Sequence, residues 1–237
     1  MKINLNIRKI KSRMPLTEYG PWWNISIGFA QWQEPEKVDA IRNWLIANES
    51  RIIEQFPLLN DGGTGLGYES VTSRSGMYNL FDFADECPEL NDLLKFFRLS
   101  YIKFIAEDKT EHKELDIVCW FNVVKDTQQI KEHAHCSEPD SYLSGNMHFD
   151  NYPTHTYYRT PFNPFERVPY QNIKGGFTMF PSYVPHKTDV FNSDNDGVRI
   201  SVAFDLHLAD QPTDLYVRRP FMNRDIFNEV IKDLEDN

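Results

Sequence analysis

Three histidines in the second half of the chain have the types and spacing that a bound metal ion requires. His133 and His135 are separated by one alanine, and His186 follows the segment 180–185. Residues two apart on a β-strand project from the same face, so His133 and His135 can both contact one cation. Neutral imidazole is the side chain that most commonly binds metals in proteins. The sequence therefore predicts a metal site made of these three side chains.

A run with one polar face follows the histidines. Between Arg199 and Leu206, polar or small residues alternate with large apolar residues, the pattern of a strand between a cavity and a packed layer. A guanidinium can bind a carboxylate through two parallel hydrogen bonds, and Ser201 could donate another. This pattern predicts an anion site at Arg199 and Ser201. The simpler alternative is an ordinary ion pair between Arg199 and another acid of the chain.

The order of these residues resembles that of the 2-oxoglutarate/Fe(II)-dependent dioxygenases, within the superfamily that includes the prolyl hydroxylases. An isolated H-x-H pair is common, so the ordered series indicates the family rather than any one element. The resemblance extends over roughly residues 66 to 206. It is carried by Trp120-Phe121-Asn122, His133-Ala134-His135, Ser144-Gly145, Gly176 to Phe180-Pro181-Ser182, His186 and Arg199-Ile200-Ser201.

The resemblance implies a metal-centred oxidation. His133, His135 and His186 would be the catalytic ligands of Fe(II), and Arg199 and Ser201 would bind the distal carboxylate of the co-substrate 2-oxoglutarate. O2 would be the second co-substrate. The implied reaction hydroxylates an unidentified substrate while 2-oxoglutarate is decarboxylated to succinate.

The second ligand departs from the usual pattern of the superfamily. Most of these oxygenases present His-x-Asp, whereas this chain has His135 at the place of the carboxylate. The resembling family itself carries H-x-H, which favours a face of three imidazoles. Two alternatives stay open. A carboxylate of the following loop, Glu138 or Asp140, could replace His135, or the literal H-x-D of His148 and Asp150 could be the motif, although the resemblance places it one strand later.

The segment before the histidines reads as a hairpin. It would run from Trp120 to Lys131, turn near residues 125–127 and deliver His133 and His135 at the end of the returning strand. The resembling family commonly has glycine in this turn, where this chain has Asp126 or Thr127. The remaining histidines in the chain, His112, His155 and His207 among them, follow no such pattern and are interpreted as surface or hydrogen-bonded core residues.

The elements that must position these residues change in kind along the chain. Apolar residues at helical spacing predict one helix that begins at Glu34-Pro35 and ends before Phe56-Pro57, and a second from about residue 88 to 107. A last helix, from about residue 224 to 234, has Asn223 as its cap. After Glu111, short apolar runs broken by turn residues predict strands. These runs cover residues 115–124, 143–149, 176–180, 183–190 and 198–206.

Together these elements predict one oxygenase domain over residues 1–237, mainly β with flanking helices. Residues 1–110 would be an N-terminal elaboration of helices and strands, 111–207 a double-stranded β-helix of the jelly-roll or cupin-like kind, and 208–237 a C-terminal helix. The glycine-dense stretch 60–67 is interpreted as a flexible connector rather than a phosphate cradle, because no Lys-Ser or Lys-Thr follows it.

Composition limits the partners. With 25 basic and 35 acidic residues the formal net charge is −10, which argues against nucleic acid. No stretch approaches the ~20 apolar residues of a membrane span, no signal peptide is apparent, and three cysteines form no disulfide framework. We therefore expect a cytoplasmic protein without a membrane partner and with a small-molecule or peptide substrate. Two chains could form a homodimer through an apolar helix face.

Two other functions fit parts of the pattern. A cupin-like metal enzyme that does not use 2-oxoglutarate would bind its metal through the H-x-H pair, an acid such as Glu138 and the late histidine, with no role for Arg199. A non-catalytic, ligand-binding β-sandwich would need neither the metal nor the oxoacid. Retention of a divalent metal and binding of 2-oxoglutarate distinguish the three.

Overall fold

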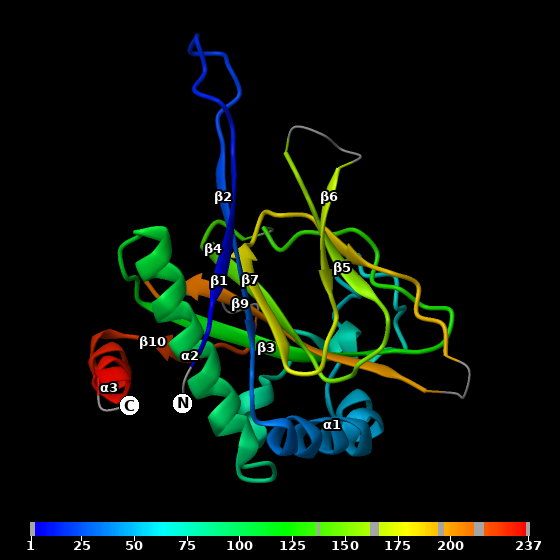
Figure 1. Ribbon diagram of the computed structural model, residues 1–237. Coiled ribbons are helices and arrows are strands. Elements are labelled where there is room, and N and C mark those ends of the chain that lie inside the picture. Colours follow the sequence, from blue (N-terminus) through cyan, green and yellow to red (C-terminus); the bar gives the residue numbers. More distant parts are fainter. Residues whose placement is uncertain (1–2, 137, 162–165, 194–196, 211–215, 236–237) are drawn as a thin grey trace.

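Two antiparallel sheets face one another, and helices α1 and α2 lie on the side of the larger sheet away from β5 and β6 (Figure 1). The computed structural model describes residues 3–136, 138–161, 166–193, 197–210 and 216–235. The elements are β1 (Asn6–Lys11), β2 (Asn24–Gln31), α1 (Pro35–Gln55), the 3-10 turns η1 (Val71–Arg74) and η2 (Leu80–Phe83), α2 (Glu89–Asp108), β3 (Leu115–Val124), β4 (Ser141–His148), β5 (His155–Arg159), β6 (Arg167–Gln171), β7 (Gly176–Pro181), β8 (His186–Thr188), β9 (Arg199–Leu208), β10 (Arg219–Met222) and α3 (Arg224–Glu235).

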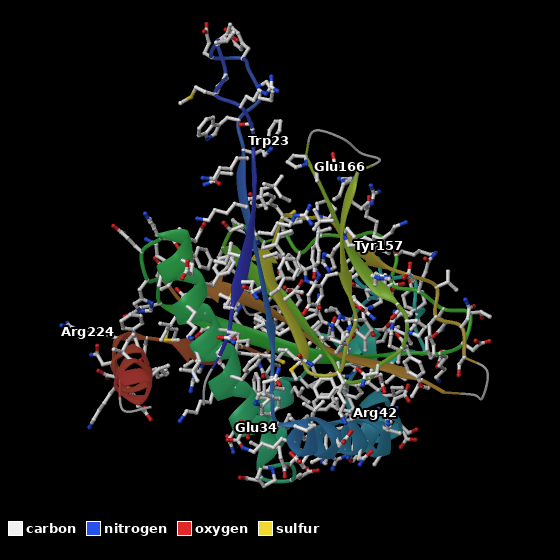
Figure 2. The ribbon with its side chains drawn as sticks, in the orientation of Figure 1. Trp23, Glu34, Arg42, Tyr157, Glu166 and Arg224 are labelled. Atoms are coloured by element: carbon white, nitrogen blue, oxygen red, sulfur yellow. The ribbon has the colours of Figure 1, made fainter. Side chains whose placement is uncertain are left out.

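The larger sheet has the strand order β1-β2-β7-β4-β9-β3-β10, and the smaller sheet has the order β6-β5-β8. The N-terminal strands extend one edge of the larger sheet beside β7, and β10 extends the other edge beside β3. The β1–β2 hairpin projects beyond the body of the protein, with Trp23 towards its tip (Figure 2). The predicted fold class, mainly β with flanking helices around a double-stranded β-helix core, is confirmed. No helix of the described chain is long and apolar enough to cross a bilayer.

Strand β9 separates the main core from the space between the sheets. Its apolar positions belong to the core cluster beneath the helices, where the ring centroid of Phe204 lies 4.5 Å from that of Phe97 on α2. Ser201 and Asp205, on the opposite face of the strand, line cavities between the sheets. The alternation read from the sequence therefore corresponds to a real division between packing and cavity.

Gly145, on β4, allows β9 to pack this closely. A Cβ atom there would overlap the ring of Phe204 and would lie 2.5 Å from the carbonyl oxygen of Thr178. Only glycine fits this position, which gives a packing reason for the Ser144-Gly145 pair of the sequence pattern.

The predicted helices and most predicted strands are confirmed within a few residues. Asn223 caps the last helix, since its Oδ1 accepts a hydrogen bond from the Ile226 amide at 2.9 Å. The run 183–190 is shorter than expected, because Ser182 and Tyr183 form a turn and only His186–Thr188 is a strand.

The predicted hairpin between Trp120 and Lys131 is wrong. Strand β3 pairs with β9 along its whole length and with β10 only at residues 115–117, and among the described residues no returning strand pairs with residues 120–124. The chain instead runs along β8. The Thr188 amide donates to the Ile130 carbonyl at 3.0 Å, and His133 and His186 form an isolated antiparallel bridge.

The turn that begins this segment holds a residue in an unfavourable conformation. Thr127 has a φ of +63°, in the left-handed region that β-branched residues rarely adopt. This is the turn where the resembling family commonly has glycine, and the structure identifies Thr127 as the residue that takes its place.

Replacing Thr127 with glycine is expected to stabilise the fold by about 1 kcal/mol, because glycine adopts positive φ without the clash of a Cβ atom. Denaturant unfolding monitored by circular dichroism measures the change. Asp126→Gly is the contrasting control and should destabilise, since the Asp126 carboxylate accepts a hydrogen bond from the Ser193 amide at 2.7 Å. An unchanged or lower midpoint for Thr127→Gly would contradict the assignment of strain.

Candidate metal centre

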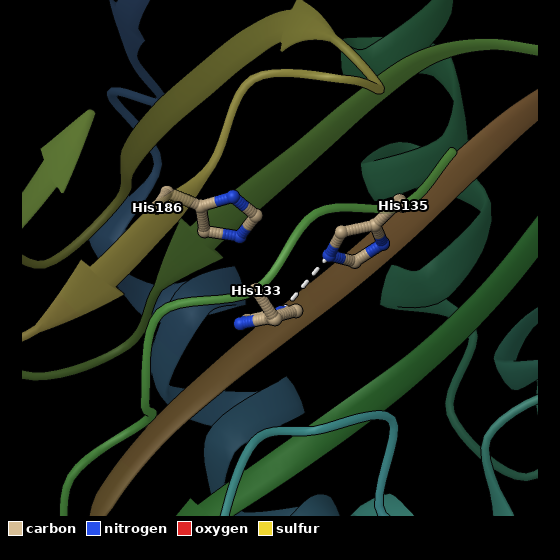
Figure 3. A group of neighbouring side chains, drawn as sticks. All are labelled: His133, His135 and His186. Carbon is tan, nitrogen blue, oxygen red and sulfur yellow. Dashed lines mark hydrogen bonds between the residues drawn. The ribbon is translucent and has the colours of Figure 1, made fainter. Parts of the chain in front are cut away.

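His133, His135 and His186 converge on one point between the sheets (Figure 3). One ligand nitrogen from each lies within 4.8 Å of the others. The Nε2 atoms of His133 and His135 are 3.1 Å apart. An ion about 2.1 Å from each nitrogen would hold neighbouring ligand nitrogens about 3 Å apart, so the spacing fits a metal ion.

The backbone explains why the three side chains meet. The His133 amide donates to the His186 carbonyl at 3.1 Å, and the His186 amide donates to the His133 carbonyl at 2.9 Å. Residues paired in this way lie directly opposite and project from the same face. His135, two residues on, is held by a bond from its amide to the Ser182 carbonyl at 2.8 Å. The i, i+2 spacing and the bridge to β8 together create the cluster.

All three rings have Nδ1 occupied by an acceptor. Nδ1 of His133 lies 2.8 Å from the Lys131 carbonyl, and Nδ1 of His186 lies 3.2 Å from the Val184 carbonyl. Nδ1 of His135 lies 2.8 Å from a carboxylate oxygen of Asp205. These acceptors favour a proton on Nδ1, which leaves the lone pair of each Nε2 directed to the centre.

Two of the histidines are held neutral near pH 7. Burial, and then the neighbouring His135, lowers the pKa of His133 to about 4. Burial, followed by His133 and His135, lowers the pKa of His186 well below its ordinary value. The Nε2 atoms of His133 and His135, 3.1 Å apart, are joined by the dashed line in Figure 3. A cation between them would be bound by both nitrogens in place of this contact.

Asp205 is a site residue that the sequence reasoning did not single out. Burial raises the pKa of Asp205, but His135 and the hydrogen bond from Ser144, at 2.6 Å, together hold it below its usual value. The Ser182 hydroxyl lies 3.0 Å from the Ser144 hydroxyl and is the donor of this bond, because the single proton of Ser144 is directed to Asp205. The sequence pattern could have indicated Asp205, because it lies on the same alternating face as Arg199 and Ser201.

Arg199 is buried and contacts no carboxylate within the described chain, although the charges of Asp189 and Asp150 act on it from beyond ion-pair distance. Its residue is 2% exposed, its Nη2 donates to the Thr188 hydroxyl at 2.7 Å, and its Nη1 has no partner. No ion pair joins it to a carboxylate within the described chain, so the simpler interpretation of Arg199 is not supported there. Burial lowers its pKa to about 10, which leaves it charged at neutral pH. An unpaired buried charge is costly, and an anionic ligand would offset that cost.

Two cavities meet at the histidines. The inner cavity is lined by all three histidines together with Asn122, His148, Thr188 and Ser201. The outer cavity, about 350 Å³, is lined by His133 and His135 but not by His186. An ion at the centre would therefore border both spaces, with Ser201 and Thr188, the hydrogen-bond partner of Arg199, at the inner one.

The alternative carboxylate ligands are engaged elsewhere or lie apart. Asp150 pairs at 2.5 Å with Arg42, which lies on α1 and is labelled in Figure 2, and it accepts a hydrogen bond from the Ile200 amide at 2.7 Å. Asp140 pairs with Arg218 at 2.5 Å. Glu138 lines the outer cavity but is not part of the three-histidine group. His148 is a buried residue that lines the inner cavity.

The glycine-dense segment, residues 60–67, is held in position by hydrogen bonds. The Asp61 carboxylate accepts from the Gly63 and Gly65 amides, each at 3.1 Å, and the Thr64 carbonyl accepts from the Lys131 amide at 2.8 Å. The segment is a connector, but it also forms one wall of the outer cavity, next to His133.

No protein-family model and no curated protein matches this sequence. Solved structures do match. The crystal structure of the non-heme alpha ketoglutarate dependent carbocyclase SnoK from nogalamycin biosynthesis aligns over 77% of this chain and 79% of its own, with a TM-score of 0.50 and 12% identity. The fold is that of the 2-oxoglutarate/Fe(II) oxygenases.

Further similar structures carry related descriptions. A prolyl-4-hydroxylase from Pseudomonas putida aligns over 76% of this chain and 92% of its own, with a TM-score of 0.49 and 11% identity. A 2OG-Fe(II) oxygenase family protein from Burkholderia pseudomallei covers 44% of this chain and 50% of its own, at a TM-score of 0.38 and 15% identity. At such identities the comparison with SnoK establishes the oxygenase fold, and the chemistry has to be argued from the site.

His148 makes the folded protein sensitive to acid. Burial, and then the charge of Arg199, lowers its pKa to about 3. In the unfolded chain the pKa of histidine is near 6.5, so the unfolded state binds the extra proton first as the pH falls. The free energy of unfolding should therefore decrease as the pH drops from about 6.5 towards 3.

His148→Gln should reduce this loss in the metal-free protein by about 3 kcal/mol between pH 7 and pH 4. Urea unfolding across that range measures it, with His155→Gln, a change at a more exposed ring, as the control. Parallel stability curves for wild type and His148→Gln would show that the ring is not held neutral by the fold.

Proposed function

We propose that this protein is a 2-oxoglutarate- and Fe(II)-dependent dioxygenase that hydroxylates a small-molecule or peptide substrate while 2-oxoglutarate is decarboxylated to succinate. One observation carries the proposal. Three convergent imidazoles line one inner cavity together with Thr188, and the Thr188 hydroxyl accepts a hydrogen bond from the buried guanidinium of Arg199, whose Nη1 has no partner. A metal ion and an anion that binds it would satisfy both at once.

His133, His135 and His186 would hold the metal through Nε2, because each Nδ1 is already committed to an acceptor. A ferrous ion bound there would supply the activation of O2 and the oxidative decarboxylation of 2-oxoglutarate. The ring of Trp120 stacks on His135 with centroids 5.7 Å apart and helps to keep that ligand in place.

The absence of a carboxylate ligand has two effects. Three neutral imidazoles leave the full charge of the cation in place, so an anionic co-substrate is attracted more strongly. Asp205 supplies a negative charge one residue further from the metal, through its contact with His135 at 2.8 Å. In His-x-Asp oxygenases the negative charge belongs to a carboxylate that binds the metal. Here it would belong to Asp205, which contacts the ligand His135.

Arg199 and Ser201 would hold the distal carboxylate of 2-oxoglutarate. The unpartnered Nη1 of Arg199 supplies the charged donor, Ser201 lines the inner cavity, and the Thr188 hydroxyl accepts from Nη2 of Arg199 and positions the guanidinium. His148 stays neutral beside them, so Arg199 supplies the positive charge at that end. Asn122 donates to the Ser201 hydroxyl at 3.3 Å and positions it.

Each of the two alternative functions leaves one feature of the site unexplained. A cupin-like metal enzyme that does not use 2-oxoglutarate gives no reason for a buried, unpaired Arg199. A non-catalytic sandwich gives no reason for three Nε2 atoms directed at one point. Both remain outcomes of the experiment below.

Anaerobic addition of Fe(II) and 2-oxoglutarate to the purified protein should produce the charge-transfer absorption of a metal-chelated oxoacid. Arg199→Met should weaken 2-oxoglutarate binding about 10- to 100-fold, since charge-assisted hydrogen bonds are lost. Arg51→Met, at an exposed arginine paired with Glu86, is the control. Neither an absorption band nor succinate formation in air from the wild type would favour the cupin-like enzyme. Failure to retain any metal would favour the sandwich.

Asp205→Asn should lower the affinity for Fe(II) about 10- to 100-fold, because the amide keeps an acceptor for His135 but loses the charge. Competition with a chromophoric chelator measures the affinity. Asp82→Asn, which removes a charge from a surface pair with Arg219, should leave it unchanged. Equal affinities in the two variants would remove Asp205 from the metal site.

A further inference from the structure

The carboxylates that line the outer cavity are not balanced by lysine or arginine. The described lining of this cavity includes Asp61, Glu138 and Asp205, and no lysine or arginine. Asp205 is held by His135, and Asp61 is held by amides of its own loop. Glu138 has no hydrogen bond or ion pair through its carboxylate within the described chain. It is therefore the uncommitted charge of the outer cavity.

Ser141 and His207 share this cavity with Glu138. The two residues are partners across β4 and β9, so their side chains lie on the same side of the sheet. The Ser141 amide also donates to the Glu138 carbonyl at 3.2 Å, which keeps the loop beside the strand. We call Glu138, Ser141 and His207 the acceptor end of the outer cavity.

The acceptor end contains polar atoms without protein partners. His207 is 3% exposed, and Asp140 and Arg218 both contact its Nδ1 at 3.3 Å. Its Nε2 has no hydrogen bond within the described chain and is the atom available to the cavity. The Ser141 hydroxyl is buried and also has no partner. A buried hydroxyl is normally hydrogen-bonded, so its lack of a partner, beside the available His207 nitrogen and the Glu138 carboxylate, points to a ligand.

The chemistry of these groups selects the ligand. A carboxylate, a hydroxyl and a ring nitrogen can all accept hydrogen bonds, and the carboxylate also needs a positive charge. An anionic substrate would meet the like charges of Glu138 and Asp61. A neutral substrate would leave Glu138 unpaired. A cation that donates several hydrogen bonds satisfies all three members of the acceptor end.

We propose that the substrate carries a primary ammonium or a similar hydrogen-bond-donating organic cation, bound by Glu138, Ser141 and His207. The remainder of the substrate would extend through the outer cavity towards His133 and His135. This inference rests on the proposed oxygenase function, because it names the substrate class of the same site. Glu138 is its specificity-determining residue.

Matched probes with one chain length and different head groups test this inference. Isothermal titration calorimetry of the protein loaded anaerobically with Fe(II) and 2-oxoglutarate would compare n-hexylamine, 1-hexanol and hexanoate. Hexylamine should bind about ten-fold more tightly than hexanol, and hexanoate should bind more weakly than either. Glu138→Gln should weaken hexylamine about ten-fold and leave hexanol nearly unchanged.

Glu54→Gln is the matched control, since it removes the same charge from an exposed position near the end of α1. Glu138→Asp, which keeps the charge, should retain most of the preference for hexylamine. Thermal melts of all variants report whether each is folded. Hexanoate binding as tightly as hexylamine, or equal hexylamine affinities in Glu138→Gln and Glu54→Gln, would overturn the inference.

Different results would overturn the proposed oxygenase function and the proposed substrate class. Succinate formation without any preference for hexylamine would overturn the substrate class and leave the oxygenase in place. A Glu138-dependent preference for hexylamine in a protein that never consumes 2-oxoglutarate would support the cation site and overturn the oxygenase.

Discussion

The reciprocal pair of backbone hydrogen bonds between His133 and His186 is the contact on which the site depends. It joins an irregular segment to the short strand β8 and places two imidazoles directly opposite each other. His135 then follows by strand periodicity, and its own amide is fixed by the turn at Ser182. Without this bridge the three rings would belong to separate parts of the chain. With it, the geometry of the site is set largely by main-chain bonding, which side-chain substitutions disturb little.

Several charged and polar groups of the site have no partner of opposite charge within the described chain. His133 and His186 are neutral, Asp205 contacts the ligand His135, and Arg199 donates to Thr188 at the inner cavity with one nitrogen and has a second, Nη1, without a partner. Each arrangement costs stability when nothing is bound, since buried polar groups without partners are unfavourable. Where several such groups lie in one region, a ligand of complementary charge that pairs with them removes this cost and therefore binds more tightly. The fold thereby favours a cation at the centre and an anion beside it.

Local patterns in the sequence were sufficient for the helices and the β9 alternation, because these depend on spacing along one segment, whereas the resemblance to a known family linked His186 to His133 and His135. The local patterns could not show where residues 125–135 would pair, since the segment bonds to β8, which lies far along the chain. The role of Asp205 could not be seen either, because it depends on the position of His135. The outer cavity also depends on long-range contacts, in particular the bond between Thr64 and Lys131.

The wall of the outer cavity and the metal cluster are built from different kinds of structure. Residues 60–64 and Glu138 lie in connections between elements, whereas Ser182, His186 and Asp205 belong to strands or to the tight turn between them. Connections tolerate insertion and exchange far better than paired strands do. Lineages descended from a common ancestor could thus acquire new ligands by remodelling these connections alone, while the histidine cluster passed unchanged from one descendant to the next.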